Sequence, residues 1–244
     1  MARWLSLLVV LALTAQPGKA VQEPKADFAC TAESFSKEFS KDKKAAEAKY
    51  KGKTIEVTGL VQLVMENGNI MLEGKPGGNN FQDDISILIR SQDLYTAGRL
   101  SVGQKVRVTG KLADFAISVA GVVDCRLEEL EASKTPVVTP EVLAKELETD
   151  AKAAANKYGK GAMVVLCKTW ELIERKEKGS SFPRTYLQMQ GTEKSRILII
   201  VNKDKFGAIK KGTPLEIRAM PPFGVFALDD NELILQQGFR VPTK

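Results

Sequence analysis

The chain has 244 residues, 43% of them hydrophobic, which is enough for two domains that each bury a core. It carries 36 Lys and Arg against 30 Asp and Glu, a formal net charge of +6, and this mild surplus is spread along the whole length rather than gathered in a basic patch of the kind that binds nucleic acid. The chain contains no histidine, so any enzyme chemistry would have to rest on carboxylates, lysines or cysteines.

The first twenty residues have the three parts of a secretory signal peptide. Arg3 supplies a positive charge, an apolar run follows from Trp4 to Ala15, and Gly18 and Ala20 place small residues where a signal peptidase cleaves. The apolar run is shorter than the roughly 20 residues that a membrane-spanning helix needs. We therefore expect residues 1–20 to be removed and the mature protein to be exported, periplasmic or extracellular, without a transmembrane segment.

An internal repeat organises the rest of the chain. The segment Phe35–Tyr50 recurs as Leu143–Tyr158 at a constant offset of 108 residues. The chain is therefore interpreted as a tandem duplication, in which residues 31–132 form the first unit and residues 141–244 the second. Residues 133–140 contain two prolines and are expected to be an extended linker. The matched positions include Lys37 with Lys145, Glu38 with Glu146, Asp42 with Asp150, and Lys49–Tyr50 with Lys157–Tyr158.

Each unit is expected to begin with an amphipathic helix, over 35–50 and over 143–158. Lysines alternate with acidic residues on the polar face, which indicates a solvated surface. Thr139 or Pro140 is expected to start the second helix, and a glycine to end each of them. The apolar positions on one face are Phe35, Phe39, Ala46 and Tyr50, then Leu143, Leu147, Ala154 and Tyr158, and the glycines are Gly52 and Gly159.

After each helix come five segments with the period-two hydrophobic pattern of β-strands, and a short connector separates the third from the fourth. In the first unit they are expected at Thr54–Val64, Ile70 and Leu72, Ile85 to Ile89, Val106 and Val108, and Ile117 to Val123, with a tight turn at Asn67–Gly68. In the second unit they are expected at Met163–Ile173, Arg184–Gln190, Arg196–Val201, Pro214–Met220 and Phe223–Phe239, the last interrupted at Asp229–Asp230.

Five strands with a connector after the third are typical of the OB-fold, a small Greek-key barrel. The predicted fold class is therefore mainly β with short helices. It consists of two tandem OB-fold-like, five-stranded antiparallel barrels, each preceded by an amphipathic helix.

Three stretches of the first unit carry a recognisable pattern: AAEAKYKGKTIEVTGLVQLV, ISILIR and VGQKVRVTGKL. In this pattern the first unit resembles the tRNA_anti-like family of OB-fold proteins. The resemblance implies OB-fold architecture and a nucleic-acid-binding label, through distant similarity to anticodon-binding domains, and it implies no catalytic residues. The residues that carry it are Ala45, Ala46, Tyr50, Gly52, Lys53, Ile55, Val57 and Gly59, then Gly103, Val106, Val108 and Gly110.

The second unit departs from this pattern at two strand glycines. Leu166 or Cys167 stands where Gly59 would align, and Ala219 stands in the place of Gly110. Glycine at a strand bend lets a barrel curl closely. The second barrel is therefore expected to be more open or differently bent.

The three cysteines are Cys30, Cys125 and Cys167, and their spacing fits no zinc site. In an oxidising compartment one disulfide and one odd thiol are expected. Cys30 and Cys125 are the preferred pair, because their link would join the mature N-terminus to the end of the first unit. The alternative is that all three are small apolar core residues.

Several other side chains are candidates for a functional site. Nucleic-acid binding by an OB-fold needs aromatic stacking platforms beside a basic groove, and the total number of aromatic residues is small for that role. The acidic pairs are better interpreted as solvated turn residues than as calcium ligands, and the glycine-rich loop lacks the ending of a phosphate-binding loop. The lysine-rich stretch is interpreted as a polar connector. These candidates are Phe81, Tyr95 and Phe115 with Arg90, Lys105 and Arg107, then Asp83–Asp84, Asp229–Asp230, Gly74–Asn80 and Lys203–Lys211.

Three functional hypotheses follow. The leading one is an exported, non-enzymatic binding or scaffolding protein, whose barrels present loops to an envelope protein, a glycan or a small molecule. The second is a nucleic-acid-binding OB-fold protein, and the third is a hydrolytic enzyme that uses carboxylates. The sequence assigns no catalytic, metal-ligating or ligand-binding residue and implies no cofactor, so the candidate disulfide Cys30–Cys125 is its only site prediction.

Overall fold

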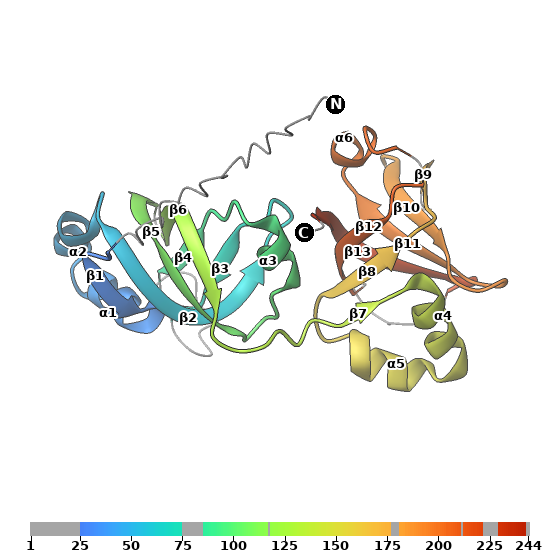
Figure 1. Ribbon diagram of the computed structural model, residues 1–244, viewed down its shortest axis with the longest axis horizontal. Helices are drawn as coiled ribbons and strands as arrows, with labels where there is room; N and C mark the ends of the chain where they lie inside the picture. The colour runs from blue at the N-terminus through green and yellow to red at the C-terminus, as the bar shows by residue number, and fades with distance from the viewer. Residues whose placement is uncertain are drawn as a thin grey trace, which may run out of the picture.

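The computed structural model of the chain describes residues 25–74, 85–116, 118–176, 181–210, 212–221 and 229–242. Two β-sheets, one within residues 28–129 and one within 137–241, form two lobes that lie side by side (Figure 1). No helix in these described ranges is long and apolar enough to cross a membrane. The predicted leader, Phe81, Asp83–Asp84, Ile117, most of the glycine-rich loop and Phe223 lie outside the described residues.

The first lobe is a five-stranded barrel. Its strands are β2 (Thr54–Val64), β3 (Ile70–Leu72), β4 (Ser86–Ile89), β5 (Lys105–Phe115) and β6 (Val119–Glu129), with helix α3 (Leu94–Arg99) between the third strand and the fourth. They pair in the order β2-β3-β4-β6-β5, and β5 pairs back with β2 to close the barrel. This confirms the expected OB-fold order.

Among the five strands of the first barrel, the pairing of β4 with β6 is parallel, which differs from the fully antiparallel expectation. The reason is geometric, because an odd number of strands in a closed ring cannot alternate direction at every pairing. The β2–β3 connection is the predicted tight turn, in which Gly68 has a φ of +80°.

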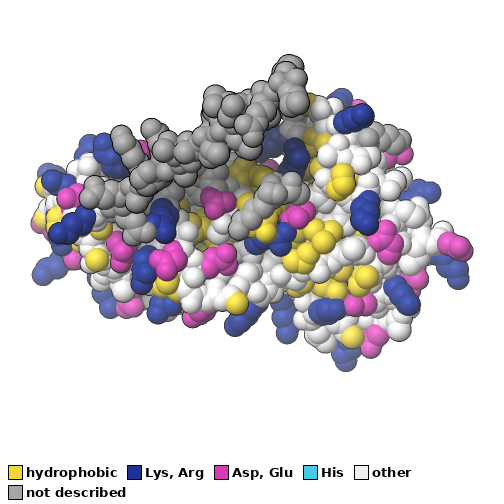
Figure 2. Space-filling view, in the orientation of Figure 1, with side chains coloured by type: hydrophobic (Ala, Val, Ile, Leu, Met, Phe, Trp, Pro, Cys, Tyr) yellow, Lys and Arg dark blue, Asp and Glu magenta, His cyan; other side chains and the backbone are white. Residues whose placement is uncertain are grey.

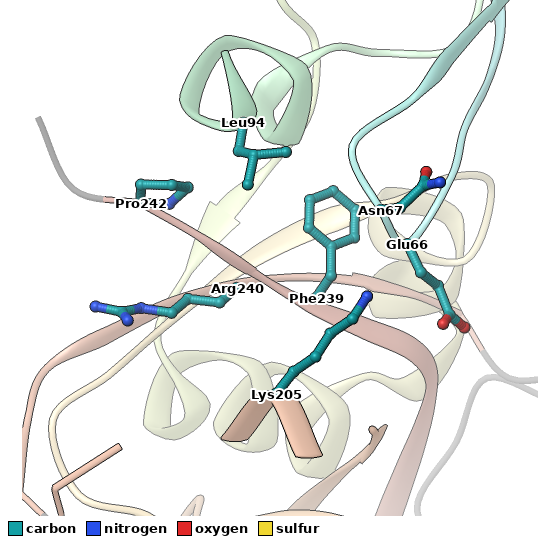
Figure 3. A pocket seen from close by; sticks show the side chains of 7 residues that line it. All are labelled: Glu66, Asn67, Leu94, Lys205, Phe239, Arg240 and Pro242. Carbon is teal, nitrogen blue, oxygen red and sulfur yellow. The ribbon is translucent and has the colours of Figure 1, made fainter. Parts of the chain in front are cut away.

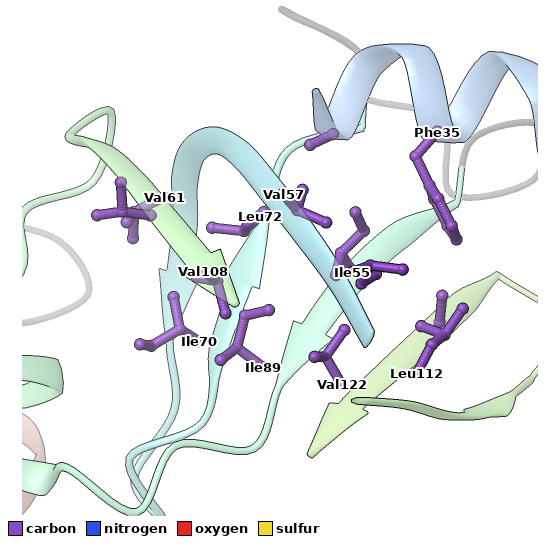
Figure 4. Packing of buried hydrophobic residues seen from close by; sticks show 14 of the residues in the cluster. Phe35, Ile55, Val57, Val61, Ile70, Leu72, Ile89, Val108, Leu112 and Val122 are labelled. Carbon is purple, nitrogen blue, oxygen red and sulfur yellow. The ribbon is translucent and has the colours of Figure 1, made fainter. Parts of the chain in front are cut away.

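The core of the first barrel is formed by alternate residues of all five strands (Figure 4). Phe35 enters it from helix α1 (Ala32–Lys41), which covers one end of the barrel. A Cβ atom on Gly59 would lie 2.8 Å from the Cβ of Ala32, so glycine at the bend of β2 lets this helix pack directly on the strand. The labelled core residues are Phe35, Ile55, Val57, Val61, Ile70, Leu72, Ile89, Val108, Leu112 and Val122.

The predicted single helix of each unit is two short helices, which is a correction to the sequence interpretation. In the first unit α1 ends and α2 (Lys43–Tyr50) begins at Asp42, whose φ and ψ are −152° and 95°. Its carboxylate accepts a 3.0 Å hydrogen bond from the Ala45 amide, which caps the second helix. In the second unit α4 (Pro140–Thr149) and α5 (Ala151–Tyr158) meet in the same way at Asp150.

The second lobe repeats this barrel with its first strand divided. Its elements are β8 (Met163–Cys167), β9 (Glu171–Arg175), β10 (Arg184–Gln190), β11 (Arg196–Val201), α6 (Lys203–Phe206), β12 (Leu215–Met220) and β13 (Glu232–Val241). The sheet order is β8-β12-β13-β11-β10-β9, so the ring closes through the chain between β8 and β9. At this break the side chain of Trp170 packs in the core of the second barrel, and its Nε1 donates a 2.8 Å hydrogen bond to the Thr213 carbonyl.

Two short strands were not anticipated from the sequence. Strand β1 (Phe28–Thr31) runs parallel to β2, with Cys30 opposite Val57. Strand β7 (Val137–Val138) runs parallel to β8, with Val138 opposite Val165. Both pairs obey the same 108-residue offset, so the end of the expected linker is a strand that continues the internal repeat.

Candidate functional site

The two barrels contact each other through α3 of the first and strands β12 and β13 of the second (Figure 1). Phe239 and Val241 of β13 are buried and pack with the hydrophobic core of the first barrel rather than with that of their own. A Cβ atom on Gly98 of α3 would lie only 2.5 Å from Val241 Cγ2. The helix and the strand can therefore approach this closely because residue 98 has no side chain.

Arg218 of β12 lies at the centre of this contact and is only 2% exposed. Its Nη1 atom donates hydrogen bonds to the carbonyl oxygens of Leu100, at 2.6 Å, and Gly98, at 3.1 Å. Gly98 lies in the last turn of α3 and Leu100 is its C-cap residue, and at this end of a helix the unpaired carbonyl groups and the helix dipole favour a cation. Burial lowers the pKa of the guanidinium to about 10, so the group stays charged at neutral pH.

The edge of the contact is polar. Arg99 of α3 makes an ion pair with Glu216 of β12, and both side chains are partly buried. The segment between the barrels is attached at the same place, because the Thr135 hydroxyl donates a 2.9 Å hydrogen bond to the Leu100 carbonyl. The start of the predicted linker therefore packs against the first barrel and helps to set the position of the second.

A cavity of about 470 Å³ opens beside this contact (Figure 3). The β2–β3 turn and the start of α3 form one wall, and α6 and the end of β13 form the other. Its volume is that of a small-molecule site, and OB-folds commonly use the loop between their first two strands to bind ligands. We call it the junction cavity, and its lining residues are Glu66, Asn67, Leu94, Lys205, Phe239, Arg240 and Pro242.

The junction cavity has an apolar floor and charged rims. Leu94, Phe239 and Pro242 supply the apolar surface. Lys205 extends into the space between Phe239 and Glu66, whereas the guanidinium of Arg240 points away from it (Figure 3). The cavity can therefore offer an apolar contact together with one cation and one anion.

The basic residues considered for nucleic-acid binding are mostly paired. Arg90 lies 2.7 Å from the Asp114 carboxylate, and Arg107 lies 2.9 Å from that of Glu128. Lys105 is exposed on β5. On the face drawn in Figure 2, Lys and Arg side chains are interspersed with Asp and Glu side chains. These residues do not form the continuous basic groove that single-stranded nucleic acid needs.

The aromatic candidates that the structure describes are already in contact with other side chains. Phe115 stacks on Phe39 with ring centroids 4.9 Å apart, and so belongs to the packing around the first core. The ring of Tyr95 lies 4.7 Å from the guanidinium carbon of Arg99 at the barrel junction. Phe81 lies outside the described residues. Neither described ring forms a free stacking platform.

The structure does not bring the predicted disulfide partners together. Cys30 and Cys125 are unpaired thiols, as is Cys167. Strand β1 with Cys30 pairs with β2, which pairs with β5, which in turn pairs with β6 and Cys125. Two strands therefore lie between the cysteines, although a disulfide needs Cα atoms within about 7 Å. Burial raises the pKa of both thiols, to about 11 for Cys30 and about 12 for Cys125.

The second acidic pair forms a hairpin turn. The backbone groups of Asp229 and Glu232 exchange hydrogen bonds of 2.9 and 2.8 Å, and Asp230 and Asn231 between them have φ values of 47° and 63°. Positive φ at both central positions is the geometry of a tight hairpin turn. Within the described ranges no group of three or more Cys, Asp or Glu side chains could hold a metal ion.

Two features of the site were missed by sequence reasoning. Arg218 occupies a position in β12 where alternation places a residue on the outer face, so its sequence pattern is that of a solvated residue. The sequence predicts a polar connector around Lys205, whereas in the structure α6 places Lys205 on the wall of the junction cavity. For Arg218 the sequence does contain one signal: Thr109 stands at the matched position of the first unit, so the repeat replaces a threonine by an arginine.

Comparison with known proteins bears on the first barrel. A model of the tRNA_anti-like family matches residues 5–127, half of the chain. The match ends within β6, so it includes all or most of every strand of the first barrel and none of the second. No curated protein matches the chain.

Proposed function

The chain belongs to the tRNA_anti-like family, and from that premise we propose that it is an exported, non-enzymatic binding protein that holds its ligand where its two barrels meet. The ligand is a segment of an envelope protein, a glycan or a small molecule. The observation that carries the proposal is the junction cavity, whose walls come from both barrels.

The contacts of Arg218 support this proposal. A cavity between two mobile lobes would change shape as they move, but here one buried guanidinium joins β12 to the end of α3. A preformed cavity spares the ligand the cost of ordering its walls, so affinity improves. Two barrels held in one arrangement can therefore act as a single binding site.

Nucleic-acid binding is the alternative function, and the family resemblance favours it. The pairing of Arg90 and Arg107 with carboxylates and the packing of Phe115 argue against it. A single-stranded oligonucleotide tests it, because true binding through phosphates would weaken steeply with salt. Indifference to the oligonucleotide at low salt would remove this alternative.

Export is proposed from the composition of residues 1–20. The test is the mass of the protein recovered from an expressing cell's envelope and medium. A chain that begins at residue 21 supports export, and an intact N-terminus in the cytoplasm contradicts it.

The binding proposal is tested by native mass spectrometry of the full mature chain after exposure to an envelope extract. Lys205→Trp is the blocking variant, because the larger side chain would extend into the junction cavity (Figure 3). Lys203→Trp on the same helix is the matched control, since Lys203 is exposed and pairs with Glu174 instead. A bound species that the wild type and Lys203→Trp retain, and Lys205→Trp loses, is expected. Equal retention by all three proteins contradicts binding at this cavity.

A further inference from the structure

We infer that the junction cavity selects an amphipathic anion, a molecule with an apolar body and a single carboxylate, phosphate or sulfonate group, and that Lys205 recognises the anionic group. The inference rests on the proposed function, because it names the chemistry of the ligand that the same cavity would hold. It is carried by the apolar floor, by the direction of Lys205, and by the contrast between Lys205, which makes no ion pair in the described part of the chain, and Lys203, which pairs with Glu174.

The apolar floor is built from side chains of both barrels. Phe239 is 4% exposed, and its ring is directed toward Leu94 of α3 (Figure 3). Pro242 continues the same surface beyond the end of β13. An apolar ligand group placed here would leave water and gain roughly 25 cal/mol for each Å² that it buries.

The two lysines of α6 differ in their surroundings. Lys203 lies 2.7 Å from Glu174 and is neutralised by it. Lys205 makes no ion pair within the part of the chain that the structure describes, and it extends into the cavity (Figure 3). A cation beside an apolar floor attracts an anionic group and can form charge-assisted hydrogen bonds with it.

Glu66 limits the charge that the ligand can carry. It lies on the opposite wall, in the β2–β3 turn, and makes no ion pair within the described ranges. A second anionic group near this wall would be repelled, because like charges a few ångströms apart destabilise each other. A monoanion that directs its charge toward Lys205 and its apolar body toward the floor pairs with the lysine and places no second charge near Glu66.

Two fluorescent probes test the inference on the full mature chain. The first is 8-anilinonaphthalene-1-sulfonate, an aromatic monoanion, and the second is N-phenyl-1-naphthylamine, which has the same apolar body without the sulfonate. We expect Lys205→Met to lower the affinity for the anionic probe by about tenfold, which is the effect of losing one charge-assisted contact. The affinity for the neutral probe should not change. Glu66→Gln removes a repelling charge and is expected to raise the affinity for the anionic probe a few-fold.

The controls separate failure of this inference from failure of the proposed function. Lys203→Met should bind both probes like the wild type, and near-ultraviolet circular dichroism verifies that each variant is folded. If Lys205→Trp abolishes binding of both probes while Lys205→Met changes the affinity for neither, the cavity binds ligands, but the inference that Lys205 selects an anion is wrong. If Lys205→Trp binds both probes like the wild type, the cavity is not the binding site and the proposed function is overturned as well.

Discussion

The Nη1 atom of Arg218 lies 2.6 Å from the carbonyl oxygen of Leu100, so the second barrel caps the last turn of a helix in the first. The internal repeat allows the residues of this contact to be compared with the matched residues of the first unit. The positions that match Glu216 and Arg218 in the first unit are Arg107 and Thr109, and both are partly exposed there. The outer surface of this strand therefore faces solvent in the first barrel. In the second barrel the matched surface forms the contact with the first.

Replacing Arg218 with Met is expected to uncouple the barrels. The change leaves the Gly98 carbonyl without its buried donor, and loss of a charged hydrogen-bond partner costs about 2 kcal/mol. Urea denaturation should show the lower stability, and small-angle X-ray scattering should show a larger radius of gyration. Arg196→Met is the matched control, because Arg196 is exposed on β11 and should change the stability by less than about 0.5 kcal/mol. An unchanged radius for Arg218→Met would contradict the assigned role.

Replacing Gly98 with Ala tests the close approach of α3 and β13. In an unobstructed helix this change would stabilise the protein by up to about 1 kcal/mol. Here the new methyl group would lie 2.5 Å from Val241 Cγ2, so we expect a loss of about 1–3 kcal/mol instead.

The double variant Gly98→Ala/Val241→Ala provides the control for that prediction. Removal of the valine methyl groups makes room for the new one, so the Gly98→Ala change should become neutral or stabilising in the Val241→Ala background. The coupling energy from the four proteins measures the clash itself. Additive effects would show that the two residues are not in contact.

Much of the fold could be predicted from the sequence because the signals were local and repeated. The hydrophobic alternation of Thr54–Val64 predicted β2 with its bounds, and the expected bounds of β10 and β11 were equally accurate. Matching sequences at Asp42 and Asp150 showed the repeat but not the helix break, since Asp is also tolerated on an exposed helix face. The capping geometry became visible only in the structure.

The site could not be predicted in the same way. The junction cavity joins residues such as Glu66 and Lys205, which are far apart in the sequence and belong to different barrels. Periodicity describes which face of one element is buried and contains no information on how two barrels pack. The burial of Arg218 is a property of that packing, so strand alternation alone assigned it to solvent.

The two helix breaks predict a matched pair of stability effects. Asp42→Ala removes the side chain that accepts from the Ala45 amide, and Asp150→Ala removes the equivalent acceptor for Ala153. Each change should lower the free energy of unfolding by about 1 kcal/mol, the usual value of an N-cap. Asp→Asn at either position should keep most of the stability, because the amide oxygen still accepts the hydrogen bond. If Asp→Ala matched the wild type, the break would not depend on capping.

The thiols provide the last prediction. Burial raises the pKa of Cys30 and Cys167 to about 11 and that of Cys125 to about 12. A raised pKa keeps the thiol protonated, and only the thiolate is nucleophilic. At pH 8 the folded protein should therefore react with iodoacetamide more than about a hundredfold more slowly than a free thiol of ordinary pKa.

The same experiment in denaturant tests the predicted disulfide. Without a reductant, the separation of Cys30 and Cys125 by two strands leads us to expect three alkylated cysteines in the unfolded chain. Prior reduction should not raise that number, which serves as the internal control. One alkylated cysteine before reduction and three after it would show instead that a disulfide forms, and a peptide map would identify its partners. Because Cα atoms in a disulfide lie within about 7 Å, a Cys30–Cys125 link would also require β1 to leave β2 or the Cys125 segment of β6 to leave β5.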